Sequence, residues 1–252
     1  MPTVVVTGAT GAIGGATVVE LKKQRANVIA LSRPAVDLSS MASVRAAARE
    51  LNSSVSHIDA LLHIAAVYTS RWQKTPDGFE LMLATNYLGP FLLTNLLRDR
   101  LMRGGRVITV TAPSGTHVDM DRLLDRDRYR FSAFHSFGAT KAAGLLFTFE
   151  LARRAKRWDV RANAFHPGTV HSKGMAEVPW PMKLGMRIFG REPEQAGIDL
   201  AELALSPAHA GTSGWFFKGR RRIDPPRSTL DEAAQAKLWK RSAELVELDG
   251  GF

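Results

Sequence analysis

The chain has 252 residues, of which 45% are apolar, so it can bury one large core and is expected to form a single domain over residues 1–252. It contains no cysteine, which excludes disulfides, thiolate catalysis and cysteine-ligated metals, and no metal site is predicted. The formal net charge of +10 favours an anionic partner, but the basic runs at 153–157 and 218–222 carry no interleaved aromatics, so a phosphorylated small ligand is expected rather than a nucleic acid.

Short apolar runs of strand length alternate with longer stretches of helical period along the chain. Strands are predicted at residues 4–6, 28–31, 61–64, 107–110, 160–165 and 215–217. Helices are predicted between them, at residues 12–23, 41–51, 79–101, 139–156 and 194–205. This alternation is typical of an α/β protein with a doubly wound, Rossmann-like parallel sheet.

The interval between the second predicted strand and the next helix is unusually short. Only residues 32–40 separate the two, whereas a parallel crossover needs about a dozen residues or more. We therefore expect residues 34–38 to cross the edge of the sheet as a loop or a very short strand, without a helix.

The carboxyl end of the chain is predicted to form an amphipathic helix over about residues 229–248. Thr229 and Glu232 have the spacing of a capping box, and Leu238, Trp239 and Leu245 follow on one face. We expect this helix to pack on the body of the protein.

A glycine-rich turn follows the first strand and opens the first helix, with the sequence Thr7-Gly8-Ala9-Thr10-Gly11-Ala12-Ile13-Gly14. Glycines let backbone approach a pyrophosphate closely, and a helix N-terminus supplies unpaired N–H groups and positive potential. In this setting the pattern predicts dinucleotide binding, and the alternative is a tight turn that holds no ligand. The predicted contacts are Thr7, Gly8, Thr10, Gly11, Ile13 and Gly14.

The end of the second strand carries a basic residue, Arg33. An acidic residue there would bind the ribose 2′-hydroxyl of NAD, whereas an arginine suits the 2′-phosphate of NADP. NADP(H) is therefore the predicted cofactor, with Asp37 and Leu38 expected beside its adenine ring. The alternative is that Arg33 is an ordinary surface residue.

Several motifs, in order along nearly the whole chain, resemble those of the short-chain dehydrogenase/reductase family, especially its retinol-dehydrogenase-like members. Residues 85–97 resemble the family's central helix with its active-site asparagine, which would be Asn86. Residues 164–170 resemble its Pro-Gly loop near the nicotinamide, which would bring Pro167, Gly168 and Val170 to the cofactor. Residues 203–207 and the carboxyl-terminal helix also match that subgroup.

The resemblance implies a catalytic set from which two members are missing. In the family, serine and tyrosine hydroxyls hold the substrate carbonyl, a lysine lowers the tyrosine pKa and holds the cofactor ribose, and an asparagine maintains a water-linked proton path. Asn86 and Lys141 match the asparagine and the lysine. Phe137 falls on the tyrosine, and Ala112 falls on the serine. Both hydroxyls are therefore absent from their usual positions.

Two further stretches depart from the family pattern. The family's Asn-Asn-Ala-Gly stretch is His63-Ile64-Ala65-Ala66 here, with Ala65 as an expected cofactor contact. The middle glycine of the family's nucleotide turn corresponds to Ala12. Each added Cβ lies where backbone and cofactor approach each other. The spacing of the three glycines resembles that of extended members of the superfamily, so nucleotide binding is still expected.

The missing hydroxyls leave the proton donor open. A positioned general acid is worth about 10² to 10⁴ in rate, and an oxyanion donor about 10² to 10³. Ser114, His117 or Tyr129 could replace them, although each is more simply a polar loop residue, or the substrate could supply its own acid. Trp180, Met182, Met186 and Phe189 are expected either to form a lid over a hydrophobic ligand or to be plain core or surface contacts.

Three functions are compatible with these residues. The first is an atypical oxidoreductase that uses NADP(H) to reduce a hydrophobic, carbonyl-type and polyketide-like small molecule without the Ser-Tyr pair. The second is a redox-neutral cyclase, dehydratase or isomerase in which Phe137 is a pocket wall. The third is a non-catalytic nucleotide-binding protein. Retention of Lys141 and Asn86 argues against the third, because unused polar groups at a site cost folding stability.

The remaining expectations concern location and assembly. No eighteen apolar residues occur without interruption, and the first apolar run follows no charged leader segment, so a cytoplasmic protein without a membrane partner is expected. The resemblance also implies a homo-oligomer.

Overall fold

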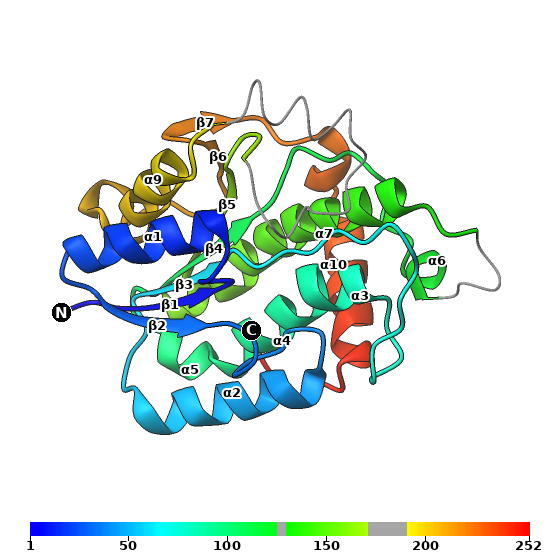
Figure 1. Cartoon of the computed structure of the whole chain (residues 1–252), viewed down its shortest axis with the longest axis horizontal. Helices are drawn as coiled ribbons and strands as arrows, with labels where there is room; N and C mark the ends of the chain where they lie inside the picture. Colours follow the sequence, from blue (N-terminus) through cyan, green and yellow to red (C-terminus); the bar gives the residue numbers. More distant parts are fainter. Residues whose placement is uncertain (125–129, 171–190) are drawn as a thin grey trace.

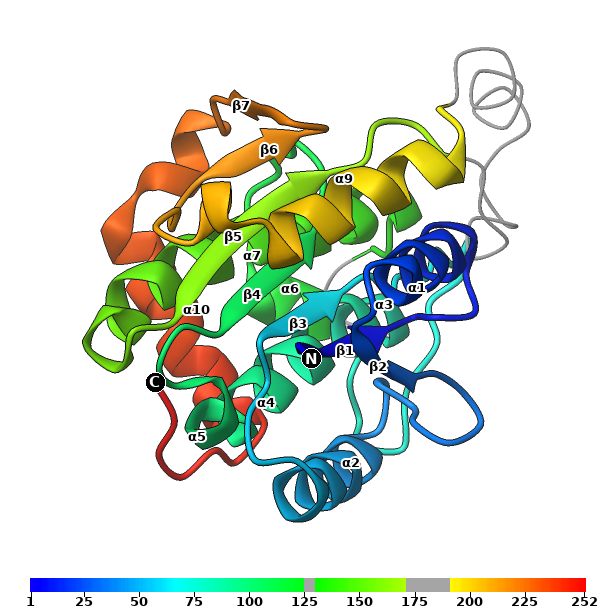
Figure 2. The ribbon, with the colours of Figure 1, turned by 90° about the vertical axis from the view of Figure 1, so that its left-hand side faces the viewer.

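The computed structural model describes residues 1–124, 130–170 and 191–252, which form a single α/β domain around one sheet (Figure 1). The strand order is β2-β1-β3-β4-β5-β6-β7, as the fanned arrows of Figure 2 show. All neighbours pair in parallel except β6 and β7. The doubly wound parallel sheet predicted from the sequence is confirmed. The strands are β1 (Thr3–Thr7), β2 (Asn27–Leu31), β3 (Ala60–His63), β4 (Arg106–Val110), β5 (Arg161–His166), β6 (Phe216–Lys218) and β7 (Arg221–Ile223).

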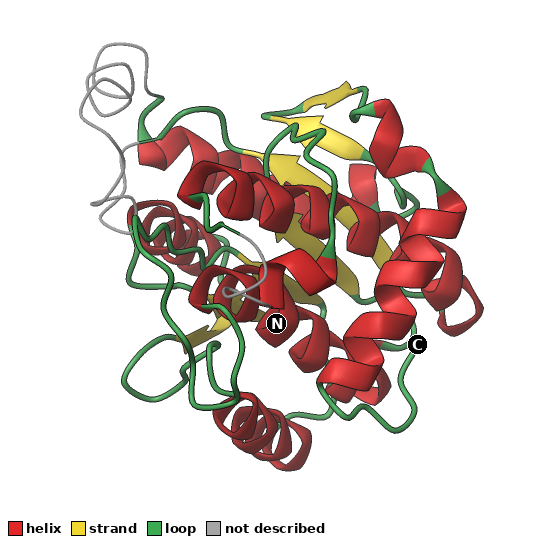
Figure 3. Cartoon of the chain, turned by 90° about the vertical axis from the view of Figure 1, so that its right-hand side faces the viewer, coloured by secondary structure: helices red, strands yellow, loops and turns green. Residues whose placement is uncertain are grey.

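Helices cover both faces of the sheet, because successive strand residues point to opposite faces and both sets are apolar. On one face, Val4 and Val6 pack in a core with residues of α1 (Ala12–Lys23) and α9 (Pro193–Leu205). On the other, Val5 joins a core with α2 (Met41–Ser54), α4 (Gly89–Leu96), α7 (Ala133–Arg154) and α10 (Glu232–Leu245). Figure 3 shows these helices layered over the strands.

The prediction that no helix forms between β2 and α2 is confirmed. Residues 32–40 form turns and loop, so β2 is the edge strand of the sheet. The loop lies against the start of α4, where a Cβ on Gly89 would overlap the carbonyl oxygen of Leu38 and lie 3.1 Å from its carbonyl carbon. This close approach fixes Asp37 and Leu38 at the carboxyl edge of the sheet.

The single helix predicted over residues 79–101 is wrong in detail, because the structure divides it. It consists of α3 (Leu81–Leu83), a π-helical turn (Ala84–Leu88), α4 and α5 (Arg98–Leu101). Pro90 lies in the first turn of α4 and has no N–H to donate to the carbonyl of Asn86. The wider turn therefore accompanies the proline, and π-turns are frequent at functional sites.

Three details of the carboxyl-terminal half and the loops were not anticipated. The basic run at 218–222 forms a β6–β7 hairpin, and a short helix α6 (Met120–Leu124) follows β4. The predicted capping box is wrong: Asp231 caps α10 by accepting hydrogen bonds from the Ala233 and Ala234 N–H groups. The Thr229 hydroxyl instead donates a hydrogen bond to the Pro226 carbonyl. The docking of α10 on the body is confirmed, since Trp239 packs against Phe91 and Phe147.

Candidate active site

The glycine turn is held in a shape that only glycine permits at two positions. Gly8 has φ +70°, and a Cβ there would lie 2.7 Å from the Ala65 Cα. A Cβ on Gly14 would overlap the Gly8 carbonyl oxygen. Gly11 is the N-cap of α1 and has no side chain that could accept a hydrogen bond from the first N–H groups of the helix. The turn therefore presents bare backbone and a helix N-terminus to an anion.

A cleft of about 910 Å³ runs along the carboxyl ends of the strands, in front of this turn. Ligands of open α/β sheets bind at this edge. Of the predicted cofactor contacts, those that line the cleft are Gly8, Thr10, Gly11, Ile13, Gly14, Arg33, Asp37, Leu38, Ala65, Lys141, Pro167, Gly168 and Val170. Ala112 and Phe137 line it too.

Thr7 is the predicted contact that does not line the cleft. It is fully buried, and its hydroxyl donates to the Leu62 carbonyl while accepting from the Ile64 and Ala65 N–H groups. Thr7 therefore ties β1 to the end of β3, which places Ala65 beside Gly8.

Asn86 lies in the π-helical turn and clamps the loop that follows β3. Its Oδ1 accepts from the Val67 N–H at 2.8 Å, and its Nδ2 donates to the Val67 carbonyl at 3.0 Å. Nδ2 also lies 3.3 Å from the Thr140 hydroxyl of α7. Asn86 does not line the cleft; it joins two segments that do.

Lys141 and Phe137 lie one turn apart on α7 and both face the cleft. The Lys141 Nζ lies 5.2 Å from the centre of the Phe137 ring. Burial lowers the pKa of Lys141 to about 8. The site therefore holds an ammonium whose charge is poorly solvated and which an anionic or hydroxyl-rich ligand would stabilise.

Hydroxyls near the end of β4 are already engaged or lie elsewhere. Thr111 precedes Ala112, and its hydroxyl donates to the Lys141 carbonyl at 2.7 Å. Ser114 bonds to the Thr116 hydroxyl, and neither Ser114 nor the exposed His117 is among the cleft-lining residues. Tyr129 and the predicted lid residues Trp180, Met182, Met186 and Phe189 lie outside the described residues.

Several polar residues that were not predicted as site residues also line the cleft, among them Tyr68 and His166. Tyr68 follows β3 on the loop that Asn86 clamps, and His166 ends β5. Burial, followed by the charge of Lys218, lowers the pKa of His166. The position of Tyr68 directly after the stretch at 63–66 was the available signal, because that stretch leads to the cofactor edge of the sheet.

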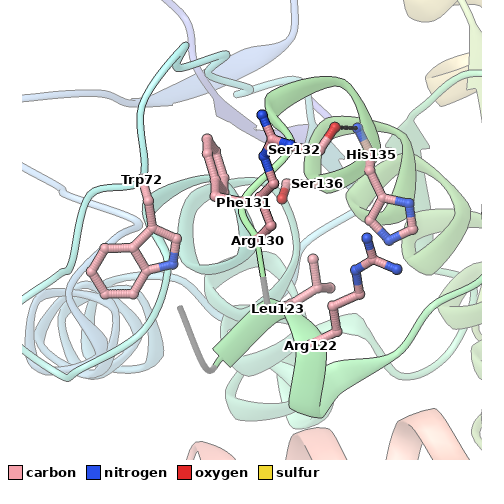
Figure 4. Close-up of a pocket in the computed structure, with 8 residues that line it drawn as sticks. All are labelled: Trp72, Arg122, Leu123, Arg130, Phe131, Ser132, His135 and Ser136. Atoms are coloured by element: carbon pink, nitrogen blue, oxygen red, sulfur yellow. Dashed lines mark hydrogen bonds between the residues drawn. The ribbon is translucent and has the colours of Figure 1, made fainter. Parts of the chain in front are cut away.

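A second, much smaller hollow lies at the start of α7 (Figure 4). Its volume is about 10 Å³, which suffices for one water molecule. Ser132 caps α7 there by accepting from the His135 N–H. The hollow shares no lining residue with the large cleft and is not part of the candidate site. It is lined by Trp72, Arg122, Leu123, Arg130, Phe131, Ser132, His135 and Ser136.

The family model described as short chain dehydrogenase matches residues 33–180. The chain belongs to the short-chain dehydrogenase family. It is 30% identical to human retinol dehydrogenase 13, over 98% of this chain and 85% of that protein. It is 32% identical to the proposed daunorubicin C-13 ketoreductase DnrU of Streptomyces sp. (strain C5), over 97% of this chain and 92% of that protein.

Solved structures support the fold of this short-chain dehydrogenase. The 3-alpha-hydroxysteroid dehydrogenase of Pseudomonas sp. B-0831, in complex with NADH, superposes with a TM-score of 0.72 at 20% identity. The match covers 92% of this chain and 98% of that one. No helix in the described part of the chain is long and apolar enough to cross a membrane.

A buried histidine distinguishes this short-chain dehydrogenase at the end of β3. His63 Nε2 lies 2.7 Å from the Thr94 hydroxyl, which itself donates to the Pro90 carbonyl. Because the Thr94 proton is used, His63 donates from Nε2, and its buried Nδ1 is an unpaired acceptor. Burial lowers the pKa of His63 to about 3.

We expect His63 to make the protein sensitive to acid. Its folded pKa lies below the ordinary value of 6.5, so the unfolded state binds more protons between these values and stability falls as pH drops from 6.5 towards 3. At pH 4.5 the resulting loss of folding stability, relative to pH 7, is on the order of 2–3 kcal/mol. Urea unfolding at pH 7 and 4.5 should show His63→Asn losing less stability between the two pH values than the native chain. His117→Asn, at an exposed histidine, should keep the native difference, and equal differences in all three proteins would contradict the assignment.

Proposed function

We propose that this short-chain dehydrogenase is an NADP(H)-dependent oxidoreductase that reduces the carbonyl of a hydrophobic small molecule or oxidises the matching alcohol. The main support for this proposal is that the glycine turn and Lys141 line the same cleft. A cradle for a pyrophosphate and a cation at the reactive end are what a bound nicotinamide dinucleotide requires of the protein.

The residues present fit such a cofactor. The bare turn, whose tight backbone packing excludes a Cβ at Gly8 or Gly14, would hold the pyrophosphate at the N-terminus of α1. Arg33 would hold the 2′-phosphate, which favours NADP over NAD, and Asp37 with Leu38 would border the adenine. Lys141 would hold the ribose, and the loop at 167–170 would border the nicotinamide. When bound, the cofactor supplies or accepts the hydride.

The end of the cleft beyond Lys141 supports a hydrophobic substrate. Val67, Tyr68, Leu81 and Phe137 are apolar or aromatic residues that line the cleft, and we propose that they lie where the substrate binds. Tyr68 and Phe137 belong to one apolar cluster with Met82. The relatives are named for retinol and daunorubicin, and both names agree with a bulky apolar substrate, the second with a polyketide. We propose that Ala112 and Phe137 replace the family's serine and tyrosine, so the reacting oxygen meets carbon at both positions.

The test is a titration with NADPH and NADH followed by turnover. We expect nicotinamide fluorescence to report tighter binding of NADPH, and a panel of hydrophobic ketones and aldehydes to yield one alcohol for each NADPH oxidised. Absence of binding at millimolar nucleotide would contradict the proposal. Tighter binding of NADH would contradict the role of Arg33 alone.

A redox-neutral cyclisation, dehydration or isomerisation is the second candidate. It is favoured by the replacement of a phenol by the Phe137 ring and by the engagement of the Thr111 hydroxyl with Lys141. Positioning alone can supply about 7–11 kcal/mol in favourable intramolecular cases. Product formation with no NADPH consumed would select this function over oxidoreduction.

A further inference from the structure

We propose that Tyr68 is the proton donor of this site, acting on the carbonyl oxygen in place of the missing tyrosine of α7. The proposal rests on the proposed oxidoreductase function. It assigns a catalytic role to a residue on the loop after β3, a different element from the one that carries Lys141.

Tyr68 lies beside the vacated position. Its ring centre is 5.4 Å from that of Phe137, and the two planes meet at 71°, edge to face. Lys141 Nζ lies 5.2 Å from the same Phe137 ring. Phe137 therefore contacts both a phenol and an ammonium, and all three residues line the cleft.

The Tyr68 side chain is buried, but its hydroxyl is not consumed by the protein. The residue is 8% exposed, and no hydrogen bond joins its hydroxyl to any residue in the described part of the chain. The buried hydroxyl of Tyr87 lies 2.7 Å from that of Ser242, as buried tyrosine hydroxyls usually find a partner. The Tyr68 hydroxyl is not among the buried polar atoms that lack a partner, so it reaches the solvent of the cleft. The Tyr68 hydroxyl is instead free to bond a ligand in the cleft.

The loop that carries Tyr68 is held on both sides. Asn86 bonds both the N–H and the carbonyl of Val67, and the Thr69 N–H bonds the Met82 sulfur at 3.5 Å. Tyr68 thus sits between two anchored residues. Such anchoring keeps a catalytic group in place before substrate arrives, which is the condition for efficient proton transfer.

Thr111, Ser114 and His166 are weaker candidates for the proton donor. The Thr111 proton is given to the Lys141 carbonyl, and Ser114 does not line the cleft. His166 does line it, but its lowered pKa keeps the ring neutral at pH 7, so it lacks the cationic proton of a strong acid. In the described part of the chain, the titratable groups that line the cleft together with Tyr68 are Arg33, Asp37, Lys141 and His166.

The proposed reduction balances as follows. The carbonyl carbon would receive a hydride, which a bound dihydronicotinamide would supply, and the carbon–oxygen π electrons would move to oxygen. The Tyr68 O–H bond breaks and its proton goes to that oxygen, which leaves a phenolate. Solvent in the cleft returns one proton to the phenolate, and the charge of Lys141, which contacts the same Phe137 ring, would favour its transient formation. Ketone, NADPH and one proton thus become alcohol and NADP⁺.

The first experiment compares Tyr68→Phe with the native enzyme. We expect kcat and kcat/KM to fall together, by about 10² to 10⁴, because a proton donor acts in the transition state. NADPH affinity, measured by fluorescence, should be unchanged. Tyr87→Phe deletes a phenol hydroxyl outside the cleft and should lower the thermal midpoint without changing turnover. Combining Tyr68→Phe with Phe137→Tyr moves the hydroxyl to the neighbouring ring and should recover part of the lost rate.

The second experiment needs no substrate. In a Tyr129→Phe background, two of the three tyrosines are left, and burial raises the pKa of Tyr87 far above the range of the titration. Tyrosinate absorbance should then report Tyr68, and it should appear at lower pH when NADP⁺ is bound, because the cationic nicotinamide favours a phenolate beside it. Adding Tyr68→Phe should remove the signal.

The outcomes separate this proposal from the function on which it rests. If the native chain binds and oxidises NADPH but Tyr68→Phe does so equally well, Tyr68 is not the donor and the oxidoreductase function stands. The same conclusion follows if NADP⁺ does not alter the tyrosinate titration, or if Ser114→Ala or His166→Asn causes the loss instead. If the native chain binds no nicotinamide nucleotide, both proposals fail.

Discussion

Replacing Gly14 by alanine is expected to remove nucleotide binding and to lower stability. The new Cβ would overlap the Gly8 carbonyl oxygen and lie 2.8 Å from its carbonyl carbon. Because these are backbone atoms, the turn must open to admit the methyl group. Overpacking of this kind typically costs about 1–3 kcal/mol. We expect NADPH affinity to fall at least about 100-fold, since each tenfold corresponds to about 1.4 kcal/mol.

A graded series makes this prediction independent of general destabilisation. A Cβ on Gly15 would lie 3.6 Å from the Ala9 carbonyl oxygen, an ordinary contact, and one on Gly11 would lie 3.3 Å from that of Gly8. Gly15→Ala adds a helix-favouring residue inside α1 and should stabilise the protein by about 0.5–1 kcal/mol with binding retained. Gly11→Ala should fall between the two. Binding by fluorescence titration and stability by urea unfolding check the order, and equal affinity across the series would show that the turn is not the nucleotide site.

The sequence was sufficient for the architecture because local patterns determine it. Apolar runs of strand length, with glycines and helix caps between them, predicted the positions of the strands. The short length of the segment at 32–40 was enough to exclude a helix between β2 and α2. The one-turn spacing of Phe137 and Lys141 likewise guaranteed a shared helix face. In each case the relation concerns residues that are close along the chain.

Contacts between residues that are far apart along the chain could not be predicted from local sequence patterns. Nothing in the local pattern indicates that Tyr68 meets Phe137, or that Thr111 gives its proton to the carbonyl of Lys141. Ser114 is a predicted proton donor because it carries a hydroxyl and follows β4. Its hydroxyl bonds to that of Thr116, and the residue does not line the cleft. The break of the central helix at the π-turn also depends on tertiary context, although Pro90 marked its place.

Replacing Lys141 by methionine is expected to weaken function and to strengthen the fold. Burial lowers the pKa of this lysine from its ordinary value of 10.5 to about 8, so the charged form is disfavoured in the folded state. The unfolded chain binds more protons between these values, so the stability of the native protein should rise with pH from about 8 to 10.5. The penalty is fully present below pH 8 and is at most about 3 kcal/mol, less whatever the water of the cleft relieves.

Lys141→Met should therefore unfold at higher urea concentration than the native protein at pH 7, and its stability should rise less between pH 8 and 10.5 than that of the native protein. Lys237→Met, at an exposed lysine of α10, is the matched control and should keep the native pH dependence. NADPH affinity should fall by about 10- to 100-fold in Lys141→Met, because hydrogen bonds to charged groups are worth about 1.5–3 kcal/mol. A buried charged side chain that lowers the stability of the free protein, and whose charge a bound anionic ligand stabilises, is typical of a ligand-binding residue. If Lys141→Met is no more stable than the native chain and binds NADPH equally well, the lysine is an ordinary residue of α7, and the cation at the reactive end of the cleft has no part in function.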